Sequence, residues 1–146
     1  MPGIIVGIDG SEHSRHALEW AVREAAIRQV PLTVLTVHQA VAGYWGGAVA
    51  YPGDADLAKE ALAMARELTN KVLAAAEPGS RPVSVQVDAV TGLPAEALLH
   101  ASEGKDLLVV GSRGTGGFAR LMLGSVSTQV SHHARCPVVI IPVETA

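Results

Sequence analysis

The chain has 146 residues, of which 49% are hydrophobic, so it predicts one domain over residues 1–146 with a substantial core. Only 17% of the residues are charged, and 11 basic against 14 acidic side chains give a net charge of −3. This composition excludes intrinsic disorder and offers no basic surface for nucleic acid, whose phosphates dominate such binding. The single cysteine, Cys136, excludes an internal disulfide and indicates a cytoplasmic protein.

One uncharged stretch raises the question of a membrane span. Residues 30–53 carry no Lys, Arg, Asp or Glu and are long enough to cross a bilayer. Pro31, several polar side chains and four glycines argue against that, and the N-terminal residues do not resemble an export signal. We expect a buried strand followed by a glycine-rich loop over residues 43–53, and no membrane partner.

Apolar runs alternate with amphipathic stretches along the chain. The run Ile4–Ile8 is typical of a strand covered on both faces. Residues 12–28 then repeat apolar side chains at helical spacing, with Ser11 in the N-cap position. Residues 83–89 alternate apolar and polar side chains, which favours an edge strand with one face in water.

The predicted elements are strand 4–8, helix 12–28, strand 32–37, helix 57–72, strand 83–89, helix 95–102, strand 107–110, helix 125–133 and strand 138–141. The second helix ends before Pro78, and Pro94 stands where the first turn of the third helix tolerates it. Five strands separated by helices imply an α/β fold with one mostly parallel sheet and helices on both faces.

The strongest functional signal is the glycine-rich segment from Gly111 to Ser125, between a buried strand and a helix. Ligands of open α/β sheets bind beyond the carboxyl ends of the strands. Glycines let the backbone approach an anion, the helix start favours phosphate, and Arg113 and Arg120 add cations. The alternative is a surface loop whose glycines serve tight turns only. The strand–loop–helix context favours the phosphate site.

Two common nucleotide motifs and a metal site are not predicted. No Gly-Lys-Ser/Thr follows the glycines, so the segment is not a P-loop. Gly114, Gly116 and Ala119 match the dinucleotide fingerprint, but no acidic residue lies about 20 positions further on to hold a ribose, which excludes a nicotinamide cofactor. His132 and His133 are adjacent in a helix and cannot chelate one metal.

The spacing of Gly111, Gly114, Gly124 and Ser125 is G-x2-G-x9-G-[ST], and in this the chain resembles the nucleotide-binding members of the universal stress protein family. Three further segments resemble the family: Val6–Ser11, Gly92–Pro94 and Cys136–Val139. The resemblance implies a Rossmann-like sheet of the adenine nucleotide alpha hydrolase-like kind, with strand order 3-2-1-4-5. It also implies a site for ATP or AMP and, often, a homodimer.

The resemblance also implies which residues hold the nucleotide. They are Gly7 and Asp9 after the first strand, Val37 pairing with the adenine edge, Gly111 and Gly114 along the ribose and phosphates, and Gly124, Ser125, Val126 and Ser127 at the start of the last helix. Asp9 also has a structural alternative, because an Asp before Gly-Ser is common in turns and caps.

The function expected is a stress-response regulatory protein that binds ATP or AMP, with or without Mg²⁺, as a switch or binding module. A slow ATPase or self-phosphorylating enzyme, and an interaction protein with a vestigial site, remain as alternatives. No catalytic residue is predicted, since neither a P-loop lysine nor a carboxylate base stands beside the glycines. Residues 138–141 are apolar on both faces at a sheet edge, which favours a homodimer through that strand.

Overall fold

The computed structural model describes residues 2–39, 41–42, 48–49, 54–112 and 124–142. The strands of its larger sheet are β1 (Ile4–Ile8), β2 (Leu32–Gln39), β5 (Val85–Gly92), β6 (Leu107–Gly111) and β7 (Val138–Ile141). They lie in the order β5-β2-β1-β6-β7, and every neighbouring pair is parallel. Counted along the chain this order is 3-2-1-4-5, which confirms the expected fold class.

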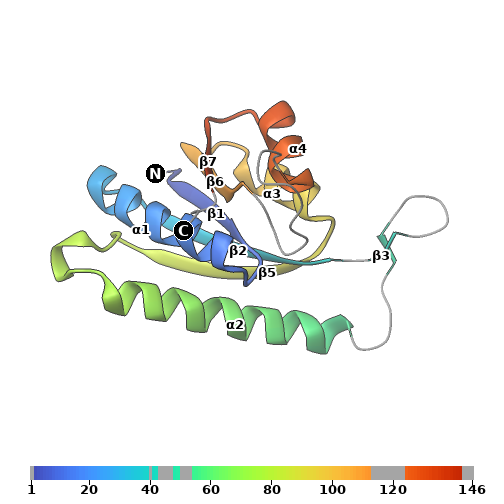
Figure 1. Ribbon diagram of the computed structural model, residues 1–146, viewed down its shortest axis with the longest axis horizontal. Coiled ribbons are helices and arrows are strands. Elements are labelled where there is room, and N and C mark those ends of the chain that lie inside the picture. The colour runs from blue at the N-terminus through green and yellow to red at the C-terminus, as the bar shows by residue number, and fades with distance from the viewer. Residues whose placement is uncertain (1, 40, 43–47, 50–53, 113–123, 143–146) are drawn as a thin grey trace.

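Helices lie on both faces of this sheet. Within the described residues they are α1 (Glu12–Arg28), α2 (Asp54–Ala75), α3 (Pro94–Ser102) and α4 (Ser125–His133), with a short 3₁₀ turn, η1, at Pro78–Ser80. α1 and α2 cover one face, and α3 and α4 cover the other (Figure 1). Alternate side chains of β1 point to opposite faces, so Ile4 and Val6 pack towards α1 while Ile5 packs towards α3.

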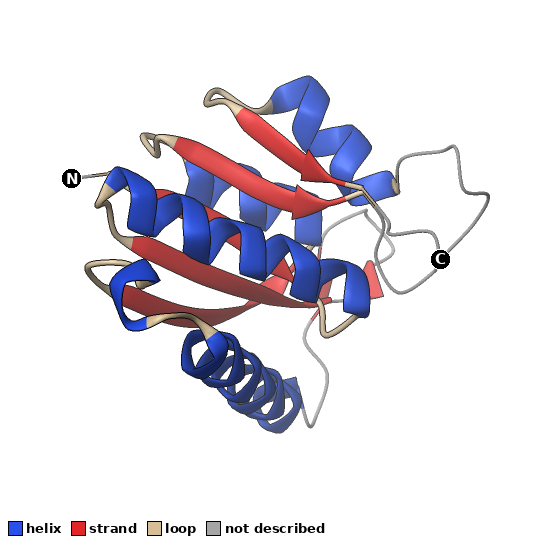
Figure 2. Cartoon of the chain, turned by 60° about the vertical axis from the view of Figure 1, so that its left-hand side comes forward, coloured by secondary structure: helices blue, strands red, loops and turns tan. Residues whose placement is uncertain are grey.

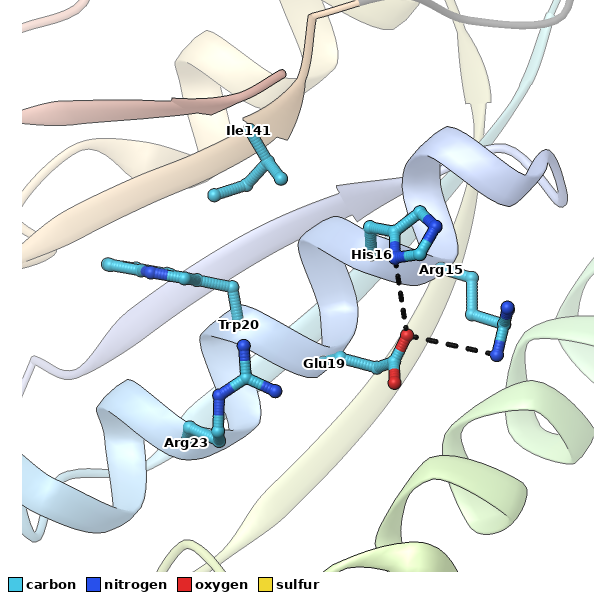
Figure 3. Close-up of a pocket in the computed structure, with 6 residues that line it drawn as sticks. All are labelled: Arg15, His16, Glu19, Trp20, Arg23 and Ile141. Carbon is cyan, nitrogen blue, oxygen red and sulfur yellow. Dashed lines mark ion pairs between the residues drawn. The ribbon is translucent and has the colours of Figure 1, made fainter. Parts of the chain in front are cut away.

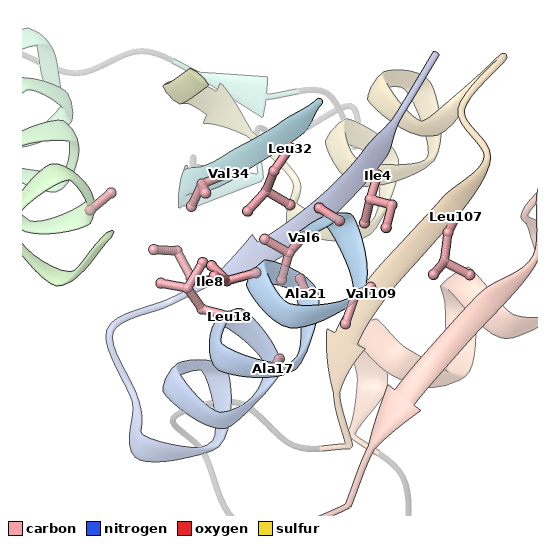
Figure 4. Close-up of a cluster of buried hydrophobic side chains, with 13 residues drawn as sticks. Ile4, Val6, Ile8, Ala17, Leu18, Ala21, Leu32, Val34, Leu107 and Val109 are labelled. Carbon is pink, nitrogen blue, oxygen red and sulfur yellow. The ribbon is translucent and has the colours of Figure 1, made fainter. Parts of the chain in front are cut away.

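Two hydrophobic clusters hold these layers together. The first, drawn in Figure 4, joins β1 and β6 to α1 through fully buried side chains that include Val6, Leu18 and Val109. The second joins the opposite face of the sheet to α3 and α4 through Leu98 and Val130. Full burial of such a side chain contributes roughly 1.5–3 kcal/mol. The central strand, apolar towards both faces, therefore anchors the fold.

α1 begins and ends where the sequence predicts. The hydroxyl oxygen of Ser11 accepts a hydrogen bond from the Ser14 amide at 3.2 Å, as an N-cap does. At the other end Gln29 adopts a left-handed conformation with φ 55°, and its amide donates to carbonyls of the last turn. The Ser11 cap is a local signal, which is why the sequence alone located the start of α1.

Several predicted boundaries are wrong. β2 continues to Gln39 rather than ending at 37, and α2 spans Asp54–Ala75 rather than 57–72. β5 runs over Val85–Gly92 rather than 83–89, because its partner β2 begins at Leu32 opposite Val85 and continues to Gln39 opposite Gly92. Val83 is 60% exposed before the strand begins. The expected loop over residues 43–53 contains Ala48–Val49, which forms strand β4 and pairs antiparallel with β3 (Val41–Ala42). Strands of two residues have no periodicity to detect.

The uncharged stretch over residues 30–53 includes β2, β3 and β4. Among the helices that the structure describes, none is long and apolar enough to cross a membrane.

Candidate functional site

The carboxyl ends of the parallel strands lie at one edge of the sheet, towards which the strand arrowheads in Figure 2 point. The chain passes from β1 to β2 through α1, whereas β6 pairs with the other side of β1, so the strand order reverses there. Ligands of open α/β sheets bind at such a reversal. Asp9, Val37 and Gly111 lie at or near the ends of these three neighbouring strands.

Asp9 has a defined role in the turn between β1 and α1. Its Oδ1 accepts a hydrogen bond from the Ser11 amide at 2.9 Å, and its own amide donates to the hydroxyl of Ser14 at 3.2 Å. Gly10 follows with φ +86°, a conformation that favours glycine. Asp9 therefore has the turn role that the sequence analysis left open. The Asp9 carboxylate is exposed beside the carboxyl end of β1.

Gly7 lies inside β1 and has a packing role. A Cβ atom at this position would lie 2.8 Å from Cδ2 of Leu98 on α3. Glycine at this position therefore allows α3 to approach the sheet, which the sequence did not reveal.

Val37 is the first residue of β2 beyond its last pair with β1, Ile8 with Thr36. On its other side Val37 pairs with Val90 of β5. Its side chain packs against the cluster beneath α3 and α4. The backbone of Val37 thus lies where the ladder with β1 has ended, which is the placement that an adenine edge would need.

The end of β6 is tied to the start of α4 through Ser112. The carbonyl oxygen of Ser112 accepts hydrogen bonds from the Gly124 amide at 2.7 Å and from the Ser127 hydroxyl at 3.0 Å. The Ser112 amide donates to the carbonyl of Ile141, at the end of β7, at 2.8 Å. The sequence did not single out Ser112, because its role here is carried by backbone atoms that any residue type has.

Between Ser112 and Gly124 the segment lies outside the described residues. Arg113, Gly114 and Arg120, which the sequence assigns to the phosphates, belong to it. The aromatic residues Tyr44 and Trp45 likewise lie outside the described residues.

The first turn of α4 differs from that of α1. Its N-cap residue is Gly124, which has no side chain to accept from the first amides of the helix, unlike Ser11 at α1. Ser125 is exposed and Val126 half-buried, so this end of the helix reaches the surface. Free amides and the positive end of the helix dipole attract anions. Ser127, by contrast, is buried at 2% exposure.

A separate shallow pocket lies on the outward face of α1, beside the end of β7 (Figure 3). Its lining residues are Arg15, His16, Glu19, Trp20, Arg23 and Ile141. Arg15 contacts Glu12 at 2.7 Å and Glu19 at 3.8 Å, and Nδ1 of His16 lies 3.6 Å from Glu19. The pocket shares no residue with the predicted nucleotide site, and these ion pairs join side chains of one helix.

Within the described ranges no group of three His, Cys, Asp or Glu side chains lies close enough to hold a metal ion. His132 and His133 have ring centroids 6.4 Å apart with planes tilted by 56°.

Comparison with known proteins identifies relatives over nearly the whole chain. A universal stress protein of Mycolicibacterium smegmatis is 34% identical over 139 residues, which are 95% of this chain and 47% of that protein. One from Mycobacterium tuberculosis is 35% identical over 142 residues, which are 96% of this chain and 48% of that protein. The chain therefore spans about half the length of the curated relatives it matches.

Solved structures share the fold. A universal stress protein in complex with cAMP has a TM-score of 0.67 and 26% identity, covering 96% of this chain and 95% of that one. The family model described as "Universal stress protein family" matches residues 2–142. With a parallel sheet in the order 3-2-1-4-5 and this match over almost its full length, the chain belongs to the universal stress protein family.

Proposed function

We propose that this protein binds an adenine nucleotide, ATP or AMP, at the carboxyl edge of its sheet and acts as a regulatory binding module in the stress response. The observation that carries the proposal is the start of α4, whose N-cap residue Gly124 has no side chain and which stands beside the end of β6. The G-x2-G-x9-G-[ST] spacing around it and the cAMP complex of a family member support the same ligand class.

Each part of the nucleotide has a matching group at this edge. The amides of Ser125 and Val126 suit phosphate oxygens, and the glycine motif adds Gly111, Gly114 and Arg113 as expected contacts. The backbone of Val37 suits the adenine edge. The exposed carboxylate of Asp9 is an oxygen donor of the kind that Mg²⁺ accepts, so a cation held with the phosphates fits here.

The protein is expected to use the nucleotide as a signal rather than as fuel. Phosphoryl transfer depends on positioned cations and an oriented nucleophile. The glycine motif brings neither a P-loop lysine nor a general base. The competing functions are a slow ATPase and an interaction protein with a vestigial nucleotide site. The proposal also includes a cytoplasmic location and a homodimer that pairs through β7.

The decisive experiment is Gly124→Asp with isothermal titration calorimetry of ATP and AMP. A carboxylate at the start of α4 repels phosphate and fills the approach, so binding should be lost. Gly79→Asp is the matched control, because it adds the same charge where a Cβ meets nothing within 4 Å. Equal affinity of the folded Gly124→Asp variant and the parent protein would refute the site.

Mass spectrometry of ligand released from freshly purified, denatured protein separates the remaining functions. A retained adenine nucleotide excludes the vestigial site. Turnover of roughly 1–100 s⁻¹, the range of kinases, abolished by Gly124→Asp, would instead establish an enzyme.

A further inference from the structure

The two ends of the glycine-rich segment meet at one carbonyl group. Gly124, at the end of the segment, donates its amide to the carbonyl oxygen of Ser112, at the beginning, over 2.7 Å. Ser127, one turn into α4, donates its hydroxyl to the same oxygen over 3.0 Å. The Gly124 amide and the Ser127 hydroxyl therefore both connect the start of α4 to the Ser112 carbonyl at the end of β6.

The proton of the Ser127 hydroxyl is committed inside the protein. A serine hydroxyl has one proton to donate, and among the described residues its acceptors are the carbonyls of Ser112 and Gly124, each at 3.0 Å. Phosphate oxygens accept hydrogen bonds and need a donor. A buried hydroxyl whose proton already points at carbonyl oxygens has none to offer them, in contrast to the exposed Ser125.

The orientation of the Ser112 carbonyl matters for an anion. A carbonyl oxygen carries partial negative charge, so a peptide turned towards the ligand edge would repel phosphate. The Gly124 amide donates to the Ser112 oxygen, and the Ser127 hydroxyl shares its one proton between this oxygen and the Gly124 carbonyl. The Ser112 amide is held by the carbonyl of Ile141 at 2.8 Å. Ser112 is thus held at its amide by the end of β7 and at its carbonyl by the start of α4, with the carbonyl oxygen towards α4.

We propose that Ser127 is a positioning residue for nucleotide binding, which holds the Ser112 carbonyl and the start of α4 in place without contacting the ligand. This inference rests on the proposed function, and it assigns Ser127 a different role from the direct phosphate contact that the family resemblance implies. The Ser127 hydroxyl makes these hydrogen bonds without a ligand, so its effect on the start of α4 can be measured in the free protein.

The test compares Ser127→Ala and Ser127→Thr with Ser131→Ala. Ser131 is the matched control, because its hydroxyl also donates to a carbonyl three residues earlier in α4, that of Thr128 at 2.8 Å, and stands four residues further along the helix than Ser127. Two quantities are measured: amide hydrogen exchange at Gly124 by NMR without ligand, and the affinities for ATP and AMP. Exchange at Val109, in the core of β6, reports any general loss of stability.

Ser127→Ala is expected to raise exchange at Gly124 about two- to tenfold and to weaken both nucleotides by a similar factor, the usual effect of one lost hydrogen bond. Ser127→Thr keeps the hydroxyl and should restore both, whereas Ser131→Ala should change neither. Exchange at Val109 should stay constant in all variants.

Two results would overturn the inference while the proposed function stands. One is a loss of affinity in Ser127→Ala with unchanged exchange at Gly124, which would make Ser127 a direct ligand contact. The other is parental affinity in Ser127→Ala. If the parent protein binds neither nucleotide, the proposed function itself has failed and the positioning role fails with it.

Discussion

Cδ2 of Leu98 lies 2.8 Å from the point where a Cβ atom on Gly7 would stand, and Cδ1 of Leu98 lies 3.0 Å from it. Leu98 is 4% exposed, so its end cannot swing into open space. A side chain at position 7 would therefore displace Leu98 from its place between α3 and the sheet. The family resemblance assigns Gly7 to the nucleotide site, but its packing against Leu98 is enough to explain why this position is a glycine.

Gly7→Ala should destabilise the protein by about 1–3 kcal/mol, the usual cost of an added methyl group in a close-packed core. Denaturant unfolding at equilibrium measures this difference. Gly92→Ala is the control, since a Cβ there meets nothing within 4 Å, and its effect should stay within about 0.5 kcal/mol. Equal unfolding free energies of the two variants would show that Leu98 and α3 can shift to accept the methyl group without loss of stability.

The sequence located those elements whose signals are local. Ser11 and the apolar stripe behind it define α1, and the unbroken apolar run defines β1, because each pattern is contained in the element itself. β5 was misplaced because its limits are set by β2, which starts opposite Val85 and ends opposite Gly92. A strand's own alternation contains no information on the length of its neighbour.

The candidate site divides in the same way. The glycine motif identified the junction of β6 and α4, since the motif is contiguous in sequence. The roles of Gly7 and Ser127 depend instead on contacts with Leu98 and Ser112, which become neighbours only in the folded sheet. Residue type and spacing could mark these positions, but not what they touch.

Asp9 allows its turn role and its ligand role to be separated. Asp9→Asn keeps the Oδ1 acceptor for the Ser11 amide but removes the charge. Its unfolding free energy should stay within about 0.5 kcal/mol of the parent, whereas Asp9→Ala leaves that amide without its partner and should lose about 1 kcal/mol. Calorimetry of ATP with and without Mg²⁺ then tests the charge.

The expected result for Asp9→Asn is loss of the Mg²⁺-dependent part of ATP affinity, with AMP affinity unchanged. A variant that binds Mg²⁺ and ATP as the parent does would restrict Asp9 to the turn.

Glu12 makes stability depend on pH at the start of α1. Arg15 donates hydrogen bonds to its carboxylate at 2.7 and 3.0 Å and adds a positive charge, and both hold the pKa of Glu12 below its usual value. A lowered pKa stabilises the fold above the unfolded value, and this contribution is lost as the pH falls through the folded value. The difference in unfolding free energy between the parent and Glu12→Gln should therefore be present at pH 7 and decrease as the pH falls through the lowered pKa of Glu12.

Because this pair is exposed, the difference at pH 7 should be small and should shrink further in high salt. Glu103→Gln is the control, an exposed carboxylate for which the described part of the chain provides no ion pair. A Glu12→Gln difference that is the same at pH 3 and pH 7 would exclude the ion pair as its source.

β7 has features of a strand that pairs with a second copy of the chain. It stands at the edge of the sheet, where β6 is its one neighbour in the described structure, and the stretch from Val138 to Ile141 is apolar and only half-buried. Natural proteins usually protect such an edge with charge, and between Pro137 and Pro142 this strand carries none. Two copies related by a two-fold axis would pair these strands antiparallel, and Pro142, which lacks an amide hydrogen, would mark where pairing stops.

Light scattering should therefore find a dimer of the parent protein at micromolar concentration, and a monomer or aggregate for Ile140→Lys. Val90→Lys places the same charge on β5, the opposite edge of the sheet, and should leave the dimer intact. Circular dichroism of both variants separates loss of pairing from loss of fold. The two edge strands also differ in chemistry. β5 carries Gln86 and Asp88, whose exposed side chains form a hydrogen bond of 2.9 Å, whereas the side chains of β7 are all apolar. A monomeric parent would mean that some other segment of the chain covers β7.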